Sequence, residues 1–179
     1  MNDYFLSTLR LAFRHWTEAD LPLAVALWGD ADVMGYMGGP VAADVAHQRL
    51  QLQMQHQLEH NYQYWPMFVR ATGAFAGCAG LRPYRDDAAV LEAGVHLARA
   101  CWSDRYGEEA ARAVITFGFQ MLGIAQVVVR HHPQNANSRA LVQRLGFRYS
   151  HDEFWAMGGF AAATYFVSRD EWLQGRQGE

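Results

Sequence analysis

The sequence has few of the features that mark a disulfide-bonded, metal-binding or nucleic-acid-binding protein. Its only two cysteines, Cys78 and Cys101, lack the C-x-x-C spacing of a zinc or redox site, so we expect reduced, buried thiols and find a disulfide unsupported. The 15 basic and 18 acidic residues are interspersed, which leaves no basic patch for a phosphate backbone or an anionic lipid. Nucleic acid and membranes are therefore not expected partners.

Long apolar runs are missing as well. No stretch approaches the ~20 apolar residues that a membrane-spanning helix needs, and Met1-Asn2-Asp3 shows no basic region ahead of an apolar segment. We therefore expect a cytoplasmic protein. What the chain does have is apolar content: of its 179 residues, 51% are hydrophobic and 13% aromatic, which suits one domain over 1–179 with a sizeable core.

The order of periodic segments predicts an α/β (α+β) domain with a central, mostly antiparallel sheet flanked by helices. Alternation predicts strands, a 3.6-residue period predicts helices, and glycine-rich or acidic segments separate them. The expected strands are 9–16, 64–70, 74–82, 89–97, 126–131 and two around Phe154 and Tyr165. The expected helices run from a Thr17–Asp20 cap to about 28, and over 44–60, 107–122 and 137–145. The breaker-rich loop 34–40 is a candidate substrate rim.

One turn lies between a predicted strand and a predicted helix, where an anion can bind. The segment 102–110 reads Trp-Ser-Asp-Arg-Tyr-Gly-Glu-Glu-Ala and precedes a helical apolar pattern. A helix N-terminus offers unpaired N–H groups and the positive end of its dipole to a phosphate, and Gly107 would let a ligand approach the backbone. A glycine that opens a helix is more often a plain turn, so this segment alone is weak evidence.

A second segment makes the pattern specific. The stretch 132–147 contains Asn135, Ser138 and a short helix ending in Leu-Gly-Phe, downstream of the W-x-x-x-Y-G-x-E-A pattern. Together these motifs resemble the Gcn5-related N-acetyltransferase (GNAT) superfamily, in its branch of ribosomal-protein N-terminal acetyltransferases, and the similarity covers nearly all of 8–172. The resemblance implies acetyl-CoA as co-substrate, no metal, and a sheet that splays between the fourth and fifth predicted strands.

The resemblance also implies where the coenzyme binds. The pyrophosphate would meet backbone N–H groups at the start of the helix, and the pantetheine arm would pair with the freed strand edge, where N–H groups near Val95 and His96 would face the thioester oxygen. Asn135 would contact the coenzyme arm, and its alternative role is a helix cap. The implied coenzyme-binding residues are Val95, His96, Leu97, Arg105, Tyr106, Gly107, Glu108, Asn135 and Ser138.

Two residues are candidates for moving protons. An amine attacks only when neutral, whereas a lysine side chain (pKa ~10.4) is mostly protonated at neutral pH, so a base is expected. Glu92, at the start of the splayed strand, is the best candidate, and its alternative is a solvent-facing strand residue. Val142 stands where many relatives carry a tyrosine that protonates the departing thiolate. Ser138 is the candidate replacement, or else it caps the helix.

Other residues have weaker claims on the site. Asp152 and Glu153 are secondary candidates for the base. Consecutive residues of a strand point to opposite faces, so at most one of His131 and His132 can face a substrate. Aromatic residues that would shape an acceptor pocket, or else belong to the core, are Tyr36, Tyr62, Trp65, Trp155 and Phe160.

The chain departs from the family pattern at Arg105, where glycine is common. This departure and Val142 motivate two other hypotheses: a sensor that binds acetyl-CoA without catalysis, and a partner-binding domain that has lost the coenzyme. We favour direct attack in a ternary complex over a covalent cysteine, because neither cysteine lies beside a histidine or at a helix start. The acceptor (a protein N-terminus, a polyamine, an amino sugar or another small amine) and a homodimer are left open.

Overall fold

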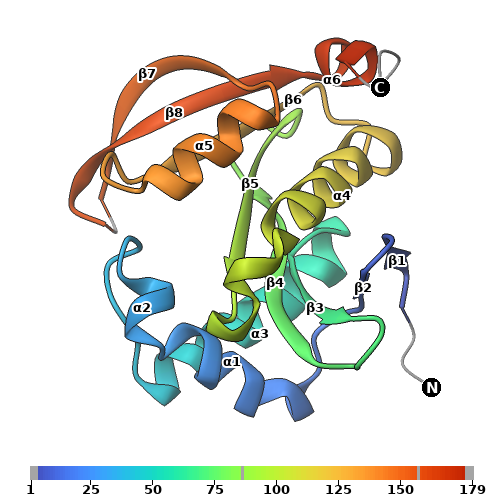
Figure 1. The fold of residues 1–179 in the computed structure, drawn as a ribbon, viewed down its shortest axis with the longest axis vertical. Helices are drawn as coiled ribbons and strands as arrows, with labels where there is room; N and C mark the ends of the chain where they lie inside the picture. The colour runs from blue at the N-terminus through green and yellow to red at the C-terminus, as the bar shows by residue number, and fades with distance from the viewer. Residues whose placement is uncertain (1–3, 86, 157, 176–179) are drawn as a thin grey trace.

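An eight-stranded sheet runs through the computed structural model, which describes residues 4–85, 87–156 and 158–175 (Figure 1). The strand order is β1-β2-β3-β4-β5-β6-β8-β7. The strands are β1 (Leu6–Ser7), β2 (Leu11–Phe13), β3 (Tyr64–Val69), β4 (Phe75–Pro83), β5 (Val90–Leu97), β6 (Gln126–His131), β7 (Arg148–Trp155) and β8 (Phe160–Ser168). The helices are α1 (Leu21–Trp28), α2 (Ala31–Met34), α3 (Ala43–His60), α4 (Tyr106–Met121), α5 (Ala136–Arg144) and α6 (Arg169–Gly175), with 3-10 turns η1 (Glu18–Asp20) and η2 (Arg99–Asp104).

The sheet opens between its two parallel strands. Every other neighbouring pair is antiparallel, as the sequence predicts, whereas β5 and β6 are parallel and pair only over 90–92 and 126–128. Both strands continue past this point, β5 to Leu97 and β6 to His131. The predicted splay between the fourth and fifth strands is therefore confirmed, and the short β1 makes these strands β5 and β6.

Different helices cover the two faces of β5. Leu91 and Ala93 share a core with residues of α4 and α5. Side chains alternate along a strand, so His96 points to the other face, where its Nδ1 accepts a hydrogen bond from Trp28 Nε1 of α1 at 3.1 Å. Figure 1 shows α1, α2 and α3 grouped away from α4 and α5. A ligand lying in the splay therefore meets two differently built surfaces.

The N-terminal strand expected over 9–16 is wrong in extent. The chain turns at 8–10, because the Thr8 N–H donates to the Leu11 carbonyl at 2.8 Å, and Leu9 is 86% exposed. The strand that remains, β2, is buried at every residue, so both faces of this strand are covered by protein and neither is exposed to solvent. Thr17 and Asp20 do form the expected capping box, which heads η1 and leads directly into α1.

Two further expectations concern thiols and membrane spans. Cys78 and Cys101 are both free and buried, as expected. Burial raises the pKa of Cys78, which keeps this residue a thiol. No helix within the described ranges has both the length and the apolar character needed to cross a bilayer.

Candidate functional site

Beyond Glu92, the backbone edge of β5 that faces the splay is no longer paired with β6. β4 still pairs with β5 up to Leu97 on the other side, and the Ala98 N–H donates to Ala76 of β4 at 3.0 Å. Successive residues point their backbone groups to opposite edges, so His96 also faces β4 while Val95 and Leu97 face the splay. The suggested role of the His96 N–H at a thioester oxygen therefore does not fit, and the Val95 N–H is the donor in the gap.

Part of this edge is already satisfied by the protein. The Leu97 carbonyl accepts a hydrogen bond from Trp102 Nε1 at 3.0 Å. Trp102 belongs to η2 and is 50% exposed. The groups left toward the splay are the Leu97 N–H and both backbone groups of Val95, which can pair with an extended amide-containing arm as a strand would.

Arg105 forms the turn between η2 and α4 in the left-handed conformation. Its φ is 56° and its ψ is 23°, and it is the N-cap of α4. Glycine adopts this conformation freely, whereas a residue with a Cβ does so at a cost of roughly 1–2 kcal/mol. Arg105 thus adopts the backbone conformation that a glycine would supply at this turn. Its side chain is exposed.

Gly107 lies where β5, α4 and α5 meet. The residue is buried, and an added Cβ would come 3.3 Å from Leu97 Cδ1 and 4.0 Å from Leu141 Cδ2. Both contacts are with ends of flexible side chains. Gly107 therefore has a packing role that the sequence did not reveal, beside the close approach of a ligand that it would permit.

The acidic residues in the first turn of α4 are neutralised by arginines. Glu108 accepts hydrogen bonds from Arg112 at 3.2 Å and from Arg144 of α5 at 2.9 Å. Burial would raise the pKa of Glu108, but these hydrogen bonds and charges lower it overall. Glu109 is paired in the same way with Arg10 at 2.6 Å. Glu108 and Glu109 are therefore both paired with arginines, so neither is left uncompensated to repel a phosphate at the helix N–H groups.

Tyr106, the first residue of α4, is half-buried under the guanidinium of Arg10, which lies 4.6 Å from the ring centroid. Stacking and the Glu109 ion pair use the same Arg10 side chain. A cation placed over an aromatic face is held electrostatically. These contacts tie the start of α4 to the N-terminal hairpin.

Asn135 and Ser138 open α5. Asn135 is the N-cap, and its Oδ1 accepts a hydrogen bond from the Ser138 N–H at 3.0 Å. The capping alternative is therefore correct for Asn135 and wrong for Ser138. Within the described residues the Ser138 hydroxyl has no hydrogen-bond partner, and the residue is half-buried. Val142, one turn further, is 6% exposed and belongs to the core.

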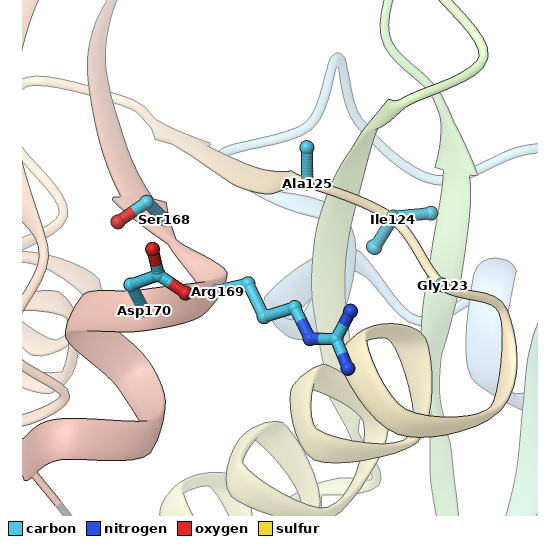
Figure 2. Close-up of a pocket in the computed structure, with 6 residues that line it drawn as sticks. All are labelled: Gly123, Ile124, Ala125, Ser168, Arg169 and Asp170. Atoms are coloured by element: carbon cyan, nitrogen blue, oxygen red, sulfur yellow. The ribbon is translucent and has the colours of Figure 1, made fainter.

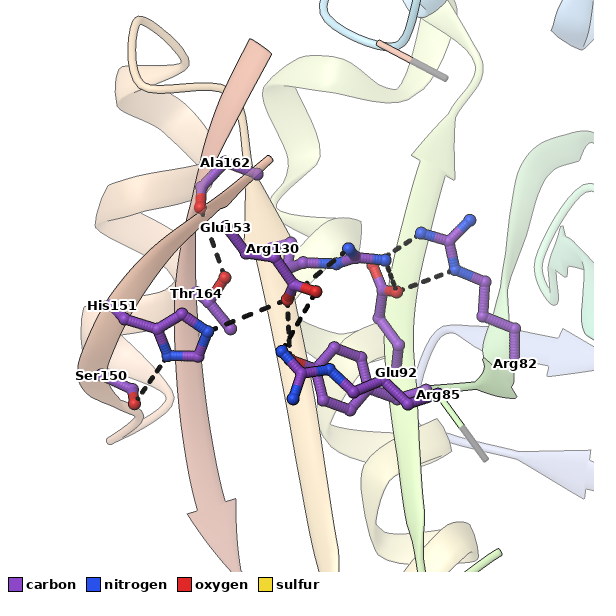
Figure 3. Close-up of polar contacts among 10 residues, drawn as sticks. Arg82, Arg85, Glu92, Arg130, Ser150, His151, Glu153, Ala162 and Thr164 are labelled. Atoms are coloured by element: carbon purple, nitrogen blue, oxygen red, sulfur yellow. Dashed lines mark hydrogen bonds and ion pairs between the residues drawn. The ribbon is translucent and has the colours of Figure 1, made fainter. Parts of the chain in front are cut away.

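Glu92 is held between two arginines from the neighbouring strands (Figure 3). It is 4% exposed, so the solvent-facing alternative is wrong. Arg82 of β4 donates from Nε at 3.0 Å and from Nη2 at 2.7 Å, and Arg130 of β6 donates from Nη2 at 2.6 Å. A carboxylate has about four acceptor positions. Three are used here, which leaves one on Oε1, so Glu92 can still accept a proton or a hydrogen bond there.

A second carboxylate continues this polar cluster toward β7. Glu153 accepts hydrogen bonds from the Tyr84 hydroxyl at 2.7 Å and from Arg85 at 3.2 Å, and lies 3.9 Å from Arg130. Burial would raise the pKa of Glu153, but these donors lower it overall. Burial and the Glu153 hydrogen bond raise the pKa of Tyr84 to about 12. Glu153 is thus the acceptor for Tyr84 and Arg85, whereas Asp152, among the residues that the structure describes, accepts only from Tyr149 at 3.3 Å.

His96 is a neutral side chain in this setting. Burial, followed by the charges of Arg82 and Arg49, lowers its pKa to about 3. Because Nδ1 accepts from Trp28, the ring proton is on Nε2. His96 therefore keeps this tautomer throughout the neutral range and does not act as a base there.

The half-buried His96 should weaken the protein in acid. Between pH 3 and 6.5 the unfolded chain binds a proton at this residue and the folded chain does not, so stability falls as the pH drops through this window. We expect the variant His96→Asn, whose amide oxygen can replace Nδ1 as acceptor, to lose less stability than the wild type between pH 7 and 4. Urea unfolding at both pH values measures the difference, and parallel losses would contradict a neutral His96.

Aromatic rings gather at the open end of the splay. The rings of Tyr36 and His132 are 5.2 Å apart, those of His132 and Phe160 are 4.3 Å apart, and Trp155 and Phe160 are 5.3 Å apart. Loop 34–40 therefore meets the end of β6 and the β7–β8 hairpin, as a rim would. Other residues of the expected aromatic and histidine sets lie elsewhere: Trp65 in the core, Tyr62 against His60, and His131 against Tyr165.

The cavity in Figure 2 lies away from this region. It has a volume of about 240 Å³ and is lined by Gly123, Ile124, Ala125, Ser168, Arg169 and Asp170. These residues precede β6 or lie where β8 ends and α6 begins, so they are at the end of the sheet where β5 and β6 are still paired. No side chain of the predicted site lines this cavity.

Comparisons with known proteins agree on one family. A family model described as "Acetyltransferase (GNAT) domain" matches residues 10–148. The "Uncharacterized N-acetyltransferase p20" of Bacillus licheniformis is 27% identical over 145 residues, covering 80% of this chain and 82% of that protein. A GNAT-family acetyltransferase from Bacillus anthracis has the same fold, with a TM-score of 0.79, 19% identity, and coverage of 93% of this chain and 99% of that one.

A solved relative carries the coenzyme. The spermidine N-acetyltransferase from Vibrio cholerae, in complex with CoA and spermine, aligns with a TM-score of 0.77 and 14% identity over 93% of this chain and 99% of that one. At this identity the likeness shows the fold alone, whereas the family model spans most of the chain. The chain therefore belongs to the GNAT acetyltransferase family and is an acetyl-CoA-dependent acyltransferase.

Proposed function

We propose that the protein transfers the acetyl group of acetyl-CoA to a primary amine by direct attack within a ternary complex. The observation that carries the proposal is the edge of β5 that β6 leaves unpaired, which ends at Leu97, beside Gly107 in the first turn of α4. An extended arm with amide groups fits such an edge, and a pyrophosphate fits a helix start whose carboxylates are already paired. When bound, acetyl-CoA supplies an activated acetyl thioester.

The chain's own residues have separate tasks in this proposal. Val95 offers its N–H to the oxygen that becomes negative as the amine attacks. Glu92 takes the proton of the amine at its free Oε1 position, directly or through one water. Ser138, whose hydroxyl is not used in capping, protonates the departing thiolate. Asn135 contacts the coenzyme arm through the amide group that faces away from its cap.

The observations favour this enzyme over a non-catalytic sensor or a partner-binding domain without coenzyme. Arg105 and Val142 motivated those alternatives. Arg105 adopts the left-handed turn that glycine would supply, and the Ser138 hydroxyl, which takes no part in the cap, can replace the tyrosine missing at Val142. Direct attack is favoured over a covalent cysteine, because Cys78 is fully buried and burial raises its pKa.

The first test is acetyl-CoA binding by calorimetry, comparing the wild type with Gly107→Val. We expect the β-branched side chain to press on Leu97 and to obstruct the helix start, lowering affinity by tenfold or more, about 1.4 kcal/mol. Gly175→Val, at the end of α6 with nothing within 4 Å of its Cβ position, is the matched control and should bind normally. Unchanged affinity in a folded Gly107→Val protein would place the coenzyme elsewhere. A thiol-release assay against amines then measures transfer.

A further inference from the structure

The face of the sheet opposite α4 and α5 holds more positive than negative side chains beside the splay. Arg82 and Arg130 share the single carboxylate of Glu92. The neighbouring Glu153 is shared by Arg130 and Arg85. Both carboxylates are therefore paired with arginines, and the network still has one guanidinium in excess.

Arg49 of α3 adds a second unbalanced charge. It is half-buried, and among the described residues it has no carboxylate partner. Arg49 precedes Gln53 by one helical turn, and Gln53 Oε1 accepts a hydrogen bond from the Tyr64 backbone N–H at 2.7 Å, so Arg49 lies on the side of α3 that faces Tyr64. The Tyr64 ring lies 5.4 Å from the ring of His96. Consistent with this placement, burial and then the charges of Arg82 and Arg49 lower the pKa of His96. A partly buried guanidinium without a counter-ion is costly. An anion at this place would relieve that cost.

The positive cluster is close to where the amine must react. Glu92 and Val95 are three residues apart on β5, about 10 Å at ~3.3 Å per residue.

Two further donors lie beside this stretch of β5. Gly94 lies between Glu92 and Val95, and the Tyr64 hydroxyl occupies the space that a Cβ on Gly94 would need. Burial raises the pKa of Tyr64 to about 12, so this hydroxyl keeps its proton and can donate. Arg82, whose side chain is 33% exposed, has no partner for its Nη1 among the described residues.

We propose that the acceptor carries a carboxylate near its reacting amine, as an amino acid does, and that Arg49 and the free Nη1 of Arg82 bind this carboxylate. The inference rests on the proposed function and narrows it. A small zwitterion satisfies both sides of the site, because its carboxylate meets the unbalanced guanidiniums and its amine meets Glu92 Oε1. A polyamine would instead bring further positive charge to a surface that already has an excess.

The test uses acceptors that differ only in the carboxylate. Lysine is compared with cadaverine, arginine with agmatine and phenylalanine with phenethylamine, with spermidine and a neutral N-terminal peptide alongside. In the thiol-release assay we expect kcat/KM to be at least tenfold higher for the carboxylate member of a pair, about 1.4 kcal/mol. Calorimetry of the same compounds on the CoA-bound protein gives a readout independent of turnover and should show the same order.

Arginine variants then locate the carboxylate. Arg49→Gln should raise KM for the preferred amino acid by about tenfold while leaving kcat/KM for its decarboxylated partner within about twofold. Arg49→Lys keeps the charge and should recover part of the loss. Arg169→Gln removes an exposed arginine at the opposite end of the sheet. It should change neither the KM for the amino acid nor the kcat/KM for its decarboxylated partner. If Arg49→Gln does not fold, the comparison of kcat/KM between matched acceptors on the wild-type protein still tests the carboxylate inference.

The outcomes separate the two proposals. Transfer to cadaverine, spermidine or the peptide at rates equal to or above those for the amino acids would overturn the carboxylate inference and leave the N-acetyltransferase standing. An equal loss on both members of a pair in Arg49→Gln would also overturn the role of Arg49. If the wild-type protein does not bind acetyl-CoA, the proposed acetyl transfer is itself contradicted.

Discussion

Glu92→Gln should both destabilise the protein and slow transfer. The wild-type carboxylate accepts three N–H groups from Arg82 and Arg130. A neutral amide leaves Arg82 without a counter-charge and Arg130 with only the more distant Glu153, at 3.9 Å, among the described residues. Removing one member of a buried ion pair costs about 3–5 kcal/mol. Since the Arg82 side chain is one-third exposed, we expect about 2–3 kcal/mol here, measured by urea unfolding.

The catalytic part of this prediction is read from the pH profile. If Glu92 accepts the proton of the amine, turnover of the folded variant should fall most on the acidic side, where more of the amine is protonated and a base is needed most. Glu171→Gln is the matched control, because Glu171 pairs with the exposed Arg148 near the far end of the sheet. It should cost less than about 1 kcal/mol and leave turnover unchanged. A Glu92→Gln profile parallel to that of the wild type would make Glu92 a positioning residue only.

Long periodic segments were predictable from the sequence because local pattern and tertiary packing agree there. The strand expected over 126–131 is β6 itself. The helix expected over 44–60 begins one residue after α3 does, and the helix expected over 107–122 is shifted from α4 by one residue at each end. The four-residue α2 was missed inside a glycine-rich stretch. Its signal was Asp30, whose side chain caps the helix through the Asp32 and Val33 N–H groups.

The cluster of Glu92 with Arg82 and Arg130 could not be predicted from the sequence, because it depends on the register of the paired strands. Arg82 lies directly across from Glu92 in the β4–β5 ladder, and Arg130 is two residues beyond the Val128 that pairs with Glu92. Neither relation follows from spacing along the chain. Similarly, the sequence named Arg105 as a departure, but its left-handed φ of 56° becomes visible only in the structure. The motifs located the turn and the helix starts, and the fold determined what each side chain touches.

Ser138→Ala should lower turnover by about 10- to 100-fold across the pH range, with little change in acetyl-CoA affinity. The reason is that the hydroxyl would supply the proton of the departing thiolate, a task that begins only as the thioester breaks. Because Asn135 caps α5 through the Ser138 backbone N–H, the serine hydroxyl is not needed for the helix. The variant should therefore keep its free energy of unfolding within about 0.5 kcal/mol, and the kinetic loss can be attributed to chemistry.

Neighbouring variants separate this role from helix capping. Asn137→Ala, at the exposed second position of α5, is the matched control and should keep wild-type turnover. Asn135→Asp retains a side-chain acceptor for the Ser138 N–H, whereas Asn135→Ala removes it and should cost about 1 kcal/mol of stability. If Asn135→Asp slows transfer while the helix stays intact, the amide of Asn135 contacts the coenzyme arm. If Ser138→Ala turns over as fast as the wild type, the departing thiolate takes its proton from water, and Val142 marks the loss of the family's acid without a replacement in the chain.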